Sequence, residues 1–329
     1  MTGPVLVFAP RPMLAVTVEE RGGAPDVHLH ADGQGVWHAH MLTSLDVPVR
    51  LCACFGGETG LVLRYLTEAE GVTVRAAAGT SRNGGYVHDC RDGERRVVAE
   101  TAGDQLSRHE LDELYEIALS EGLATGLCLL SGSADSSLLP AEVYGRLATD
   151  LSRNGCRVAA DLSGEQLSAA LVGGVYLLKV SHQELLDDGR ADGEEVPDLV
   201  AAARRLHEAG AQVVLVSRER RPALLSTGTE VCEVLMPQLE PADPREAGDS
   251  MVAGVVAGLA RGVELGDAVR LGAAAGALNV AHRGLGAGGR RAVAELAGQV
   301  RLHPVSGPPE TAIRHGRATP TDLARWTTP

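Results

Sequence analysis

Apolar positions in the first third of the chain recur in short runs that predict β-strands. These runs lie at 5–8, 14–18, 27–30, 49–54, 72–74, 86–90 and 95–99. The turn Arg21-Gly22-Gly23 separates the second run from the third, and Asp92-Gly93 separates the last two. Glycine turns between such runs are typical of hairpins, so two β-hairpins are expected. After the run 49–54, Gly56-Gly57 leads into a predicted helix.

Beyond residue 107 helical periodicity alternates with apolar runs. Helices are expected at 107–120, from Pro140, at 195–209 and at 265–281, and strands at 126–130, 157–161 and 212–216. This alternation predicts a parallel sheet flanked by helices, which binds ligands at the carboxyl ends of its strands. Ser131, Asp161, Glu184 and Ser217 all follow predicted strands. They are therefore candidate site residues.

A further helix begins near Ala247 and carries the most specific chemistry. Its apolar residues recur at helical spacing, at 251, 252, 255, 256 and 259. Gly254 and Gly258 lie one turn apart, which predicts close packing of another element. The first backbone N–H groups of such a helix suit a transferring phosphoryl group, and Asp249 beside them suits a base. The alternative is that Asp249 is the N-cap of an ordinary helix.

Composition narrows the class of protein. The 329 residues are 44% hydrophobic but only 3% aromatic, and the net charge of −13 argues against a nucleic-acid surface. Six cysteines without a C-x-x-C pair indicate buried free thiols in a reducing cytosol rather than disulfides. No signal pattern and no apolar run of membrane-spanning length is present. Lys179 is the only lysine.

The stretch Ala247-Gly248-Asp249-Ser250, followed by Ala253-Gly254, resembles the signature of the PfkB/ribokinase family of sugar kinases, with Glu246 in place of its first glycine. The resemblance implies an α/β fold with a central, mostly parallel sheet, helices on both faces and a small β-sheet lid. It also implies that Asp249 is the catalytic base and that the N–H groups of Ala247, Gly248 and Asp249 form an anion hole. ATP and Mg²⁺ are the expected cofactors.

Substrate motifs of the phosphofructokinase-like branch are only partly present. Gly33, Gln34 and Gly35 resemble its Gly-Gly-Lys-Gly motif, but Gln34 replaces the lysine and Trp37 the following asparagine. Two earlier departures are Arg11 for a family asparagine and Ala15 for an aspartate that binds sugar hydroxyls.

Two more substrate contacts are implied. Arg82 resembles an arginine that meets substrate phosphate, or else it lies on a solvated turn. Ser131 is implied as a further substrate contact.

Nucleotide contacts are implied at a larger set of positions. They are Lys179, Glu184, Ser217, Arg218, Glu246, Asn279 and Gly284. Glu184 would help to hold Mg²⁺ through water, although Ser181 and Glu184 also form a local capping-box pattern. Glu219 and Pro222 replace two family glycines, and the arginines nearby either meet phosphates or are solvated.

We expect one kinase domain over 1–303, with lid strands within 12–32 and 80–100, and a poorly ordered tail at 304–329. The lid is also a candidate homodimer surface. His28, His30, His38 and His40 suggest metal binding, substrate contact from the lid, or plain packing.

The expected function is ATP-dependent transfer to a hydroxyl of a sugar or sugar phosphate. A same-fold kinase with a non-standard acceptor and a non-catalytic binding relative are the alternatives.

Overall fold

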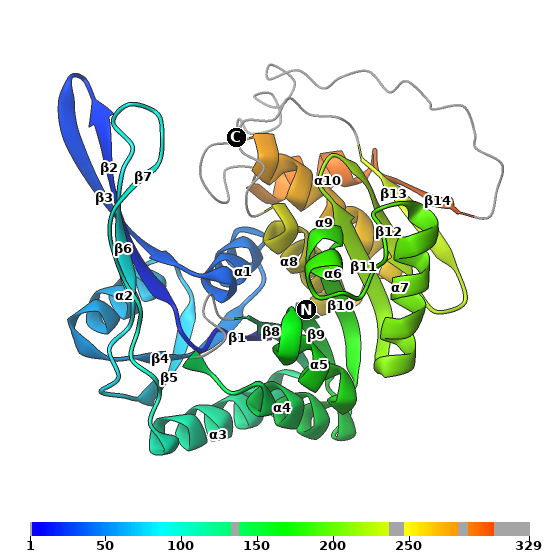
Figure 1. The fold of residues 1–329 in the computed structure, drawn as a ribbon, viewed down its shortest axis with the longest axis horizontal. Helices are drawn as coiled ribbons and strands as arrows, with labels where there is room; N and C mark the ends of the chain where they lie inside the picture. Colours follow the sequence, from blue (N-terminus) through cyan, green and yellow to red (C-terminus); the bar gives the residue numbers. More distant parts are fainter. Residues whose placement is uncertain (1, 133–137, 237–246, 282–288, 306–329) are drawn as a thin grey trace.

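The computed structural model describes residues 2–132, 138–236, 247–281 and 289–305. Their core is a ten-stranded sheet (Figure 1). Its strands, in spatial order, are β14 (Arg301–Pro304), β13 (Val231–Leu235), β12 (Arg221–Ser226), β11 (Ala211–Arg218), β10 (Val175–Ser181), β9 (Arg157–Asp161), β8 (Leu127–Ser131), β1 (Val5–Phe8), β4 (Val49–Phe55) and β5 (Thr73–Ala78). Strands β11 to β5 in this order pair in parallel, and the other three pairings are antiparallel. The predicted mostly parallel sheet is confirmed.

Helices cover both faces of this sheet because its buried strands carry apolar residues on both sides. Val5 and Val7 join the core under α1 (Gln34–Ser44), α8 (Ala247–Ala260), α9 (Leu265–Ala281) and α10 (Gly289–Ala297). Leu6 and Phe8 join the opposite core, under α3 (Arg108–Thr125), α4 (Ala141–Arg153), α5 (Gly164–Gly173) and α7 (Val196–Ala209). Successive side chains of a strand point to opposite faces of the sheet, so β1 contributes residues to both hydrophobic cores.

The two predicted hairpins form a second, smaller sheet that projects from the body (Figure 1). Its order is β3 (Ala24–Asp32), β2 (Met13–Arg21), β6 (Gly85–Asp89) and β7 (Arg96–Thr101). The register places Leu14 and Ala31 on one face, where they pack with Leu63 of α2 (Gly57–Ala69). Side chains of the other face include His28, His30, Tyr86 and His88.

Helices α8 and α9 pack at the distance that the glycine spacing predicts. A Cβ on Gly254 would lie 2.7 Å from the Cα of Gly272, and one on Gly258 would lie 2.6 Å from the Cα of Ala268. Both neighbours are backbone atoms, so any side chain at either glycine would force the helices apart. This packing fixes α8, and with it Asp249, against the sheet.

The sequence pattern missed the end of the sheet. Strands β12, β13 and β14 and helix α10 were not predicted, because their apolar runs are short and two of the strands lie near or at the sheet edge. The six cysteines are free, and four of them are buried. Among the described helices, none is both long and apolar enough to cross a membrane. The predicted tail lies, from residue 306 on, outside the described residues.

Candidate active site

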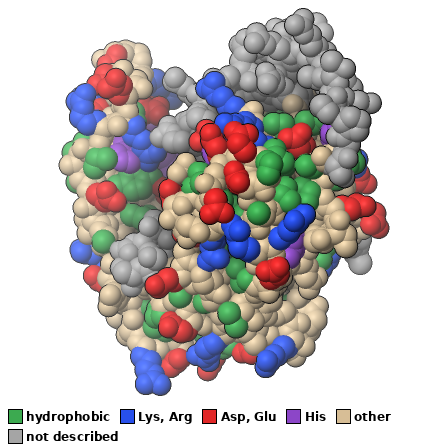
Figure 2. Space-filling view, turned by 45° about the vertical axis from the view of Figure 1, so that its right-hand side comes forward, with side chains coloured by type: hydrophobic (Ala, Val, Ile, Leu, Met, Phe, Trp, Pro, Cys, Tyr) green, Lys and Arg blue, Asp and Glu red, His purple; other side chains and the backbone are tan. Residues whose placement is uncertain are grey.

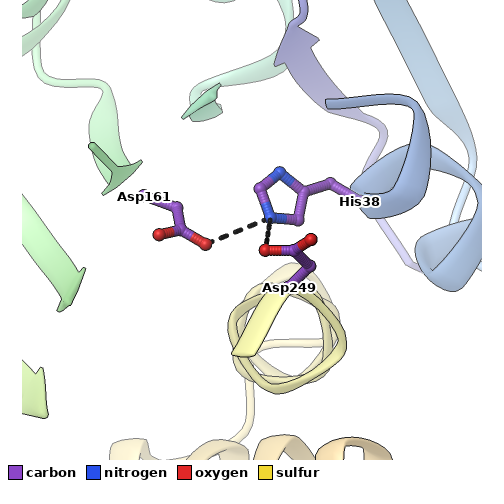
Figure 3. Close-up of side chains that lie close together, drawn as sticks. All are labelled: His38, Asp161 and Asp249. Carbon is purple, nitrogen blue, oxygen red and sulfur yellow. Dashed lines mark ion pairs between the residues drawn. The ribbon is translucent and has the colours of Figure 1, made fainter. Parts of the chain in front are cut away.

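The candidate site lies where the strand order of the main sheet reverses. Strand β1 pairs with β4 on one side and with β8 on the other. Beyond it, β8 ends at Ser131 and β9 at Asp161, and these two residues are register partners. Crevices of this kind at the carboxyl ends of parallel strands bind ligands. The N-terminal halves of α1 and α8 bring His38 and Asp249 to the same place (Figure 3).

Two carboxylates, a lysine and a histidine form the centre of the site, which we call the charged cluster: His38, Asp161, Lys179 and Asp249. Lys179 Nζ donates to Asp161 Oδ1 at 3.1 Å and to Oδ2 at 3.2 Å. His38 Nε2 lies 3.3 Å from Asp161 Oδ2 and 3.9 Å from Asp249 Oδ1 (Figure 3). His38 Nδ1 lies 2.8 Å from the Ser131 hydroxyl oxygen. The four side chains are almost completely buried, and only that of Asp249 is partly exposed to solvent.

Burial and neighbouring charges shift the three ionisable partners in different directions. Burial raises the pKa of the Asp249 carboxyl to about 6, and Asp161 adds to the rise, whereas His38, Lys179 and Gln34 oppose it. For Asp161 burial also acts to raise the pKa, but Lys179 and His38 outweigh it and the pKa falls. Burial alone would lower the pKa of Lys179, yet the carboxylates around it raise it. Of the two carboxyls in the cluster, Asp249 has the pKa closer to neutral pH, as a group that accepts a proton requires.

Gln34 and Gly248 complete the surroundings of Asp249. The side-chain oxygen of Gln34 accepts a hydrogen bond from the Gly132 N–H at 2.6 Å, and Gln34 also hydrogen-bonds Asp249. A Cβ on Gly248 would lie 2.6 Å from Lys179 Nζ. The absence of a side chain there lets the ammonium group approach the first turn of α8, where helix N–H groups also concentrate positive potential.

Residues expected near the nucleotide lie at several places. Glu184 accepts from the backbone N–H and hydroxyl of Ser181, both at 2.7 Å, which confirms the capping box that opens α6 (His182–Asp187). Ser217 lies on β11, and a Cβ on Gly248 would be 4.0 Å from its oxygen. The buried Arg218 side chain contacts Glu233 and the Pro222 carbonyl.

Asn279 is largely buried in α9. Glu246 and Gly284 lie outside the described residues. Nucleotide contact by all of these residues stays a prediction.

Residues expected near the acceptor are divided between the cluster and the small sheet. Arg82 is exposed and lines a cavity of about 280 Å³ with Glu58, Thr59 and residues of β2, β6 and β7. Arg11 is buried, and its guanidinium donates to the backbone carbonyls of residues 81, 82 and 104. It therefore braces a loop. Gly33 precedes α1, and its φ of 115° is a glycine conformation. A Cβ on Gly35 would collide with Ala9.

The sequence did not single out His38, a side chain that the structure places in the charged cluster. The sequence offered His38 only as one of four histidines. His38 and His40 lie two residues apart on α1 and so point in different directions, and His40 pairs with Glu70 at 3.0 Å. A signal was available, since position 38 falls among the buried positions of α1, where an ionisable side chain needs polar partners. His28 and His30 stack on the small sheet with ring centroids 6.1 Å apart. Among the described residues, one His/Asp/Glu/Cys group has metal-like spacing: His38, Asp161 and Asp249.

One face of the molecule carries charges of both signs. Figure 2 shows Asp and Glu side chains beside Lys and Arg side chains on the face that it presents. A histidine-bearing region lies on the projecting lobe at the upper left of that view.

Comparison with known proteins adds four findings. The model of the pfkB family carbohydrate kinases matches residues 14–290. The chain is 28% identical over 256 residues to a 1-phosphofructokinase of Bacillus subtilis, covering 77% of this chain and 82% of that protein. A 1-phosphofructokinase of Haloferax volcanii is 30% identical over 251 residues, covering 75% and 78%. The fold matches Escherichia coli phosphofructokinase-2 with a TM-score of 0.79, at 23% identity, over 91% of this chain and 99% of that one.

Proposed function

The chain belongs to the pfkB family of carbohydrate kinases and is an ATP-dependent sugar kinase, and from this premise we propose that Asp249 is the base of its phosphoryl transfer. One observation carries the proposal. Asp249 stands in the first turn of α8, beside a lysine, with its pKa raised to about 6. It is ionised at neutral pH and still basic enough to accept a proton as the acceptor oxygen becomes a nucleophile.

The residues of the cluster divide the work of the transfer. Asp249 accepts the proton of the acceptor hydroxyl while the oxygen of that hydroxyl forms a bond to the γ-phosphorus of ATP. The bond from the γ-phosphorus to the bridging oxygen breaks, and ADP leaves with that electron pair. The N–H groups of Ala247, Gly248 and Asp249 stabilise the negative charge on the transferred group.

The chain fits an anionic phosphoryl group at this place. Lys179 Nζ occupies the space that a Cβ on Gly248 would fill, so an ammonium and a helix N-terminus converge on one point. Mg²⁺ neutralises phosphate charge when it is bound. The Glu184 carboxylate is engaged in the cap of α6, and Asp161 is paired with Lys179. We therefore expect the ion to be held through phosphates and water, with Glu184 contributing indirectly.

The acceptor is a sugar hydroxyl, presented between the cluster and the small sheet. Asp32 ends β3, accepts from the Gly33 N–H at 2.7 Å and contacts the Tyr86 hydroxyl, which places polar groups two residues from Gln34. In this arrangement the polar face of the small sheet closes over the acceptor as a lid, within one kinase domain that ends near residue 303. Ser131, Gly33 and Gly35 shape the floor of that pocket. Gln34 has no charge, so a phosphate group on the acceptor needs an arginine. Arg82 is the candidate, and the cavity that it lines lies at the apolar side of the small sheet, beside Leu14 and Val16.

The apolar face of the small sheet also supports a homodimer. Val27 and Leu29 are exposed on that face. Exposed apolar residues on a projecting sheet favour association with a second copy. Light scattering should show a dimer for the unmodified chain and a monomer for Val27→Lys, while Val172→Lys, which changes an exposed residue of α5, should leave the dimer intact. A monomeric unmodified chain contradicts this proposal.

Calorimetry and turnover assays test the proposed function together. The chain should bind ATP with Mg²⁺ and should release ADP in the presence of one member of a panel of sugars and sugar phosphates. Product release must depend on Asp249. Nucleotide binding without turnover on any acceptor would favour a non-catalytic relative, and turnover confined to non-sugar alcohols would favour a kinase with a non-standard acceptor.

A further inference from the structure

His38 is a buried histidine that no role assigned so far explains. It comes from α1 and is fully buried, and its two ring nitrogens face opposite walls of the site. Nδ1 contacts the Ser131 hydroxyl at the end of β8. Nε2 points between Asp161 of β9 and Asp249 of α8, as Figure 3 shows. We propose that His38 is a positioning residue of the kinase reaction, whose Nε2–H keeps Asp249 ionised and directed at the acceptor; this rests on the proposed function of Asp249.

The partners of the ring determine where its hydrogen lies. An ionised carboxylate has no hydrogen to donate and can only accept hydrogen bonds. If Nε2 carried a lone pair, that lone pair would face two anionic oxygens at 3.3 Å and 3.9 Å. Nε2 therefore carries a hydrogen whether the ring is neutral or charged. In the neutral ring Nδ1 accepts from the Ser131 hydroxyl, which lies 2.8 Å away and fixes the ring orientation.

The charges around His38 explain why Asp249 needs it. Asp161 already has Lys179 as a close partner at 3.1 Å. Asp249 has the Gln34 amide and the more distant Lys179 charge, while Asp161 repels it. His38 Nε2 lies between the two carboxylates but has no aligned hydrogen-bond acceptor within the described part of the chain. Because Ser131 holds the ring in place, we expect the Asp249 carboxylate to move toward this N–H when the acceptor binds, closing the present distance of 3.9 Å.

Loss of His38 has a definite electrostatic direction. Burial raises the pKa of Asp249 to about 6, and His38 is the largest influence in the opposite direction. Without the ring, Asp161 and Asp249 face each other with one donor fewer, and the pKa of Asp249 rises further. The fraction of ionised base at neutral pH then falls, and it recovers as the pH rises.

A divalent metal held directly by His38 is the competing interpretation of the same atoms. The ligand atoms of His38, Asp161 and Asp249 lie within 4.8 Å of one another. The ammonium of Lys179 binds both oxygens of Asp161, however, and it would repel a cation at that carboxylate. The geometry therefore favours the hydrogen-bonding role.

Three variants test the inference. His38→Val removes the donor and keeps an apolar side chain, and His38→Gln keeps an N–H donor that reaches the place of Nε2. His40→Gln is the matched control on the same helix, because His40 contacts Glu70 outside the cluster. Thermal unfolding and ATP binding are measured first for each variant. The value of kcat/KM is then followed from about pH 5 to about pH 9 with the best acceptor.

The expected results separate positioning from packing. His38→Val should lose about tenfold or more in kcat/KM at neutral pH, with its acid limb displaced upward by about one pH unit and activity recovering at high pH. His38→Gln should stay within about threefold of the unmodified enzyme, and His40→Gln should match it. Equal loss by His38→Val at every pH would overturn the inference. So would an increased metal requirement that His38→Gln does not relieve, since that would identify a metal ligand.

A measurement without turnover distinguishes failure of this inference from failure of the proposed function. The carboxyl carbon of Asp249, labelled with ¹³C and assigned through Asp249→Asn, can be titrated by NMR. A higher titration midpoint in His38→Val than in His38→Gln supports the role of His38 even if no sugar is phosphorylated. The same midpoint in both variants would overturn the inference while leaving the kinase function standing.

Discussion

Asp249 and Glu110 are both carboxylates removed from most solvent, and their surroundings shift them in opposite directions. Glu110 accepts from the Thr80 and Ser81 N–H groups, the Ser81 hydroxyl and the Ser107 N–H, at 2.6 to 2.9 Å. Burial acts to raise its pKa, but these donors outweigh burial and lower the pKa to about 2. Asp249 has few donors and a second carboxylate nearby, so its pKa rises to about 6.

Under the proposed function, the difference separates a structural carboxylate, Glu110, from the proposed base, Asp249. The donors around Glu110 keep it ionised at neutral and mildly acidic pH, and they tie the loop at residues 80–81 to the start of α3. The surroundings of Asp249 bring its pKa close to neutral pH, where a carboxyl can both accept and release a proton. Burial alone does not mark a functional carboxyl; the number of donors that face it does.

Asp249→Asn removes the proposed base from the comparison with Glu110 and should have the largest effect on activity. Turnover should fall by on the order of 10²-fold or more, because the positioned base is lost, while ATP binding stays. Stability should not fall. A carboxyl whose folded pKa is raised favours the fold below its unfolded pKa and loses that contribution as pH rises through about 6. Steady-state kinetics and calorimetry check both points, and near-normal turnover would remove Asp249 from its role.

Glu110→Gln should instead weaken the structural carboxylate and lower the stability of the fold. The free energy of unfolding should fall by about 1.5–3 kcal/mol, since the amide accepts fewer and weaker hydrogen bonds from the same donors. Urea unfolding measures the loss, and activity per folded molecule should be preserved. The folded pKa of about 2 lies below the usual 4.5, so the contribution of Glu110 is present above about pH 4.5 and disappears toward pH 2. Equal stability of the variant and the parent at neutral pH would contradict this.

Gln34→Lys should strengthen the donors around Asp249, which are fewer than those around Glu110, by replacing an amide with an ammonium group. The unmodified enzyme should use fructose 1-phosphate and fructose 6-phosphate poorly, because the Gln34 amide offers no charge to a phosphate. The variant, alone or with Trp37→Asn, should shift the ratio of efficiencies for fructose 6-phosphate and fructose by about tenfold toward the phosphate. The prediction is wrong if the unmodified enzyme already reaches about 10⁴ M⁻¹s⁻¹ with either fructose phosphate.

Arg82→Ala should have the smallest effect, because Arg82 is exposed and lies outside the charged cluster. The Michaelis constant of a phosphorylated acceptor should rise by about threefold to tenfold, and that of a neutral acceptor should change less. Competition between the two acceptors in one assay gives the ratio directly. An equal change for both would exclude Arg82 from the acceptor site.

Sequence patterns predicted the parallel part of the main sheet and α8 because buried strands that alternate with helices, and small-residue helices, leave strong periodic signals. The run 157–161 and the helix 265–281 coincide with β9 and α9. The strands β12 to β14 left no such signal, since they pair antiparallel at one end of the sheet without helices between them, and such strands depend on their neighbours for definition. Glu184 shows that one residue can satisfy a local motif, here a capping box, whether or not it also meets a ligand.

The charged cluster was predicted only in part. Asp161 and Asp249 follow from their places at the end of a strand and at the start of a helix, whereas Lys179 was expected only from the resemblance to the kinase family. Their convergence with His38 could not be read from the sequence, because four separate elements supply them and only tertiary packing sets their distances. Glu110 was missed for the same reason, since its donors at 80, 81 and 107 come from two loops.

The pH dependence of kcat/KM in the unmodified enzyme tests most directly whether Asp249 is the base. With saturating ATP and the best sugar acceptor, kcat/KM should be constant at neutral pH and should fall tenfold per unit on the acid side, with an apparent pKa near 6. The residual activity of Asp249→Asn should lack that limb. An acid limb that persists unchanged in Asp249→Asn would show that another group accepts the proton, and it would contradict the role given to Asp249.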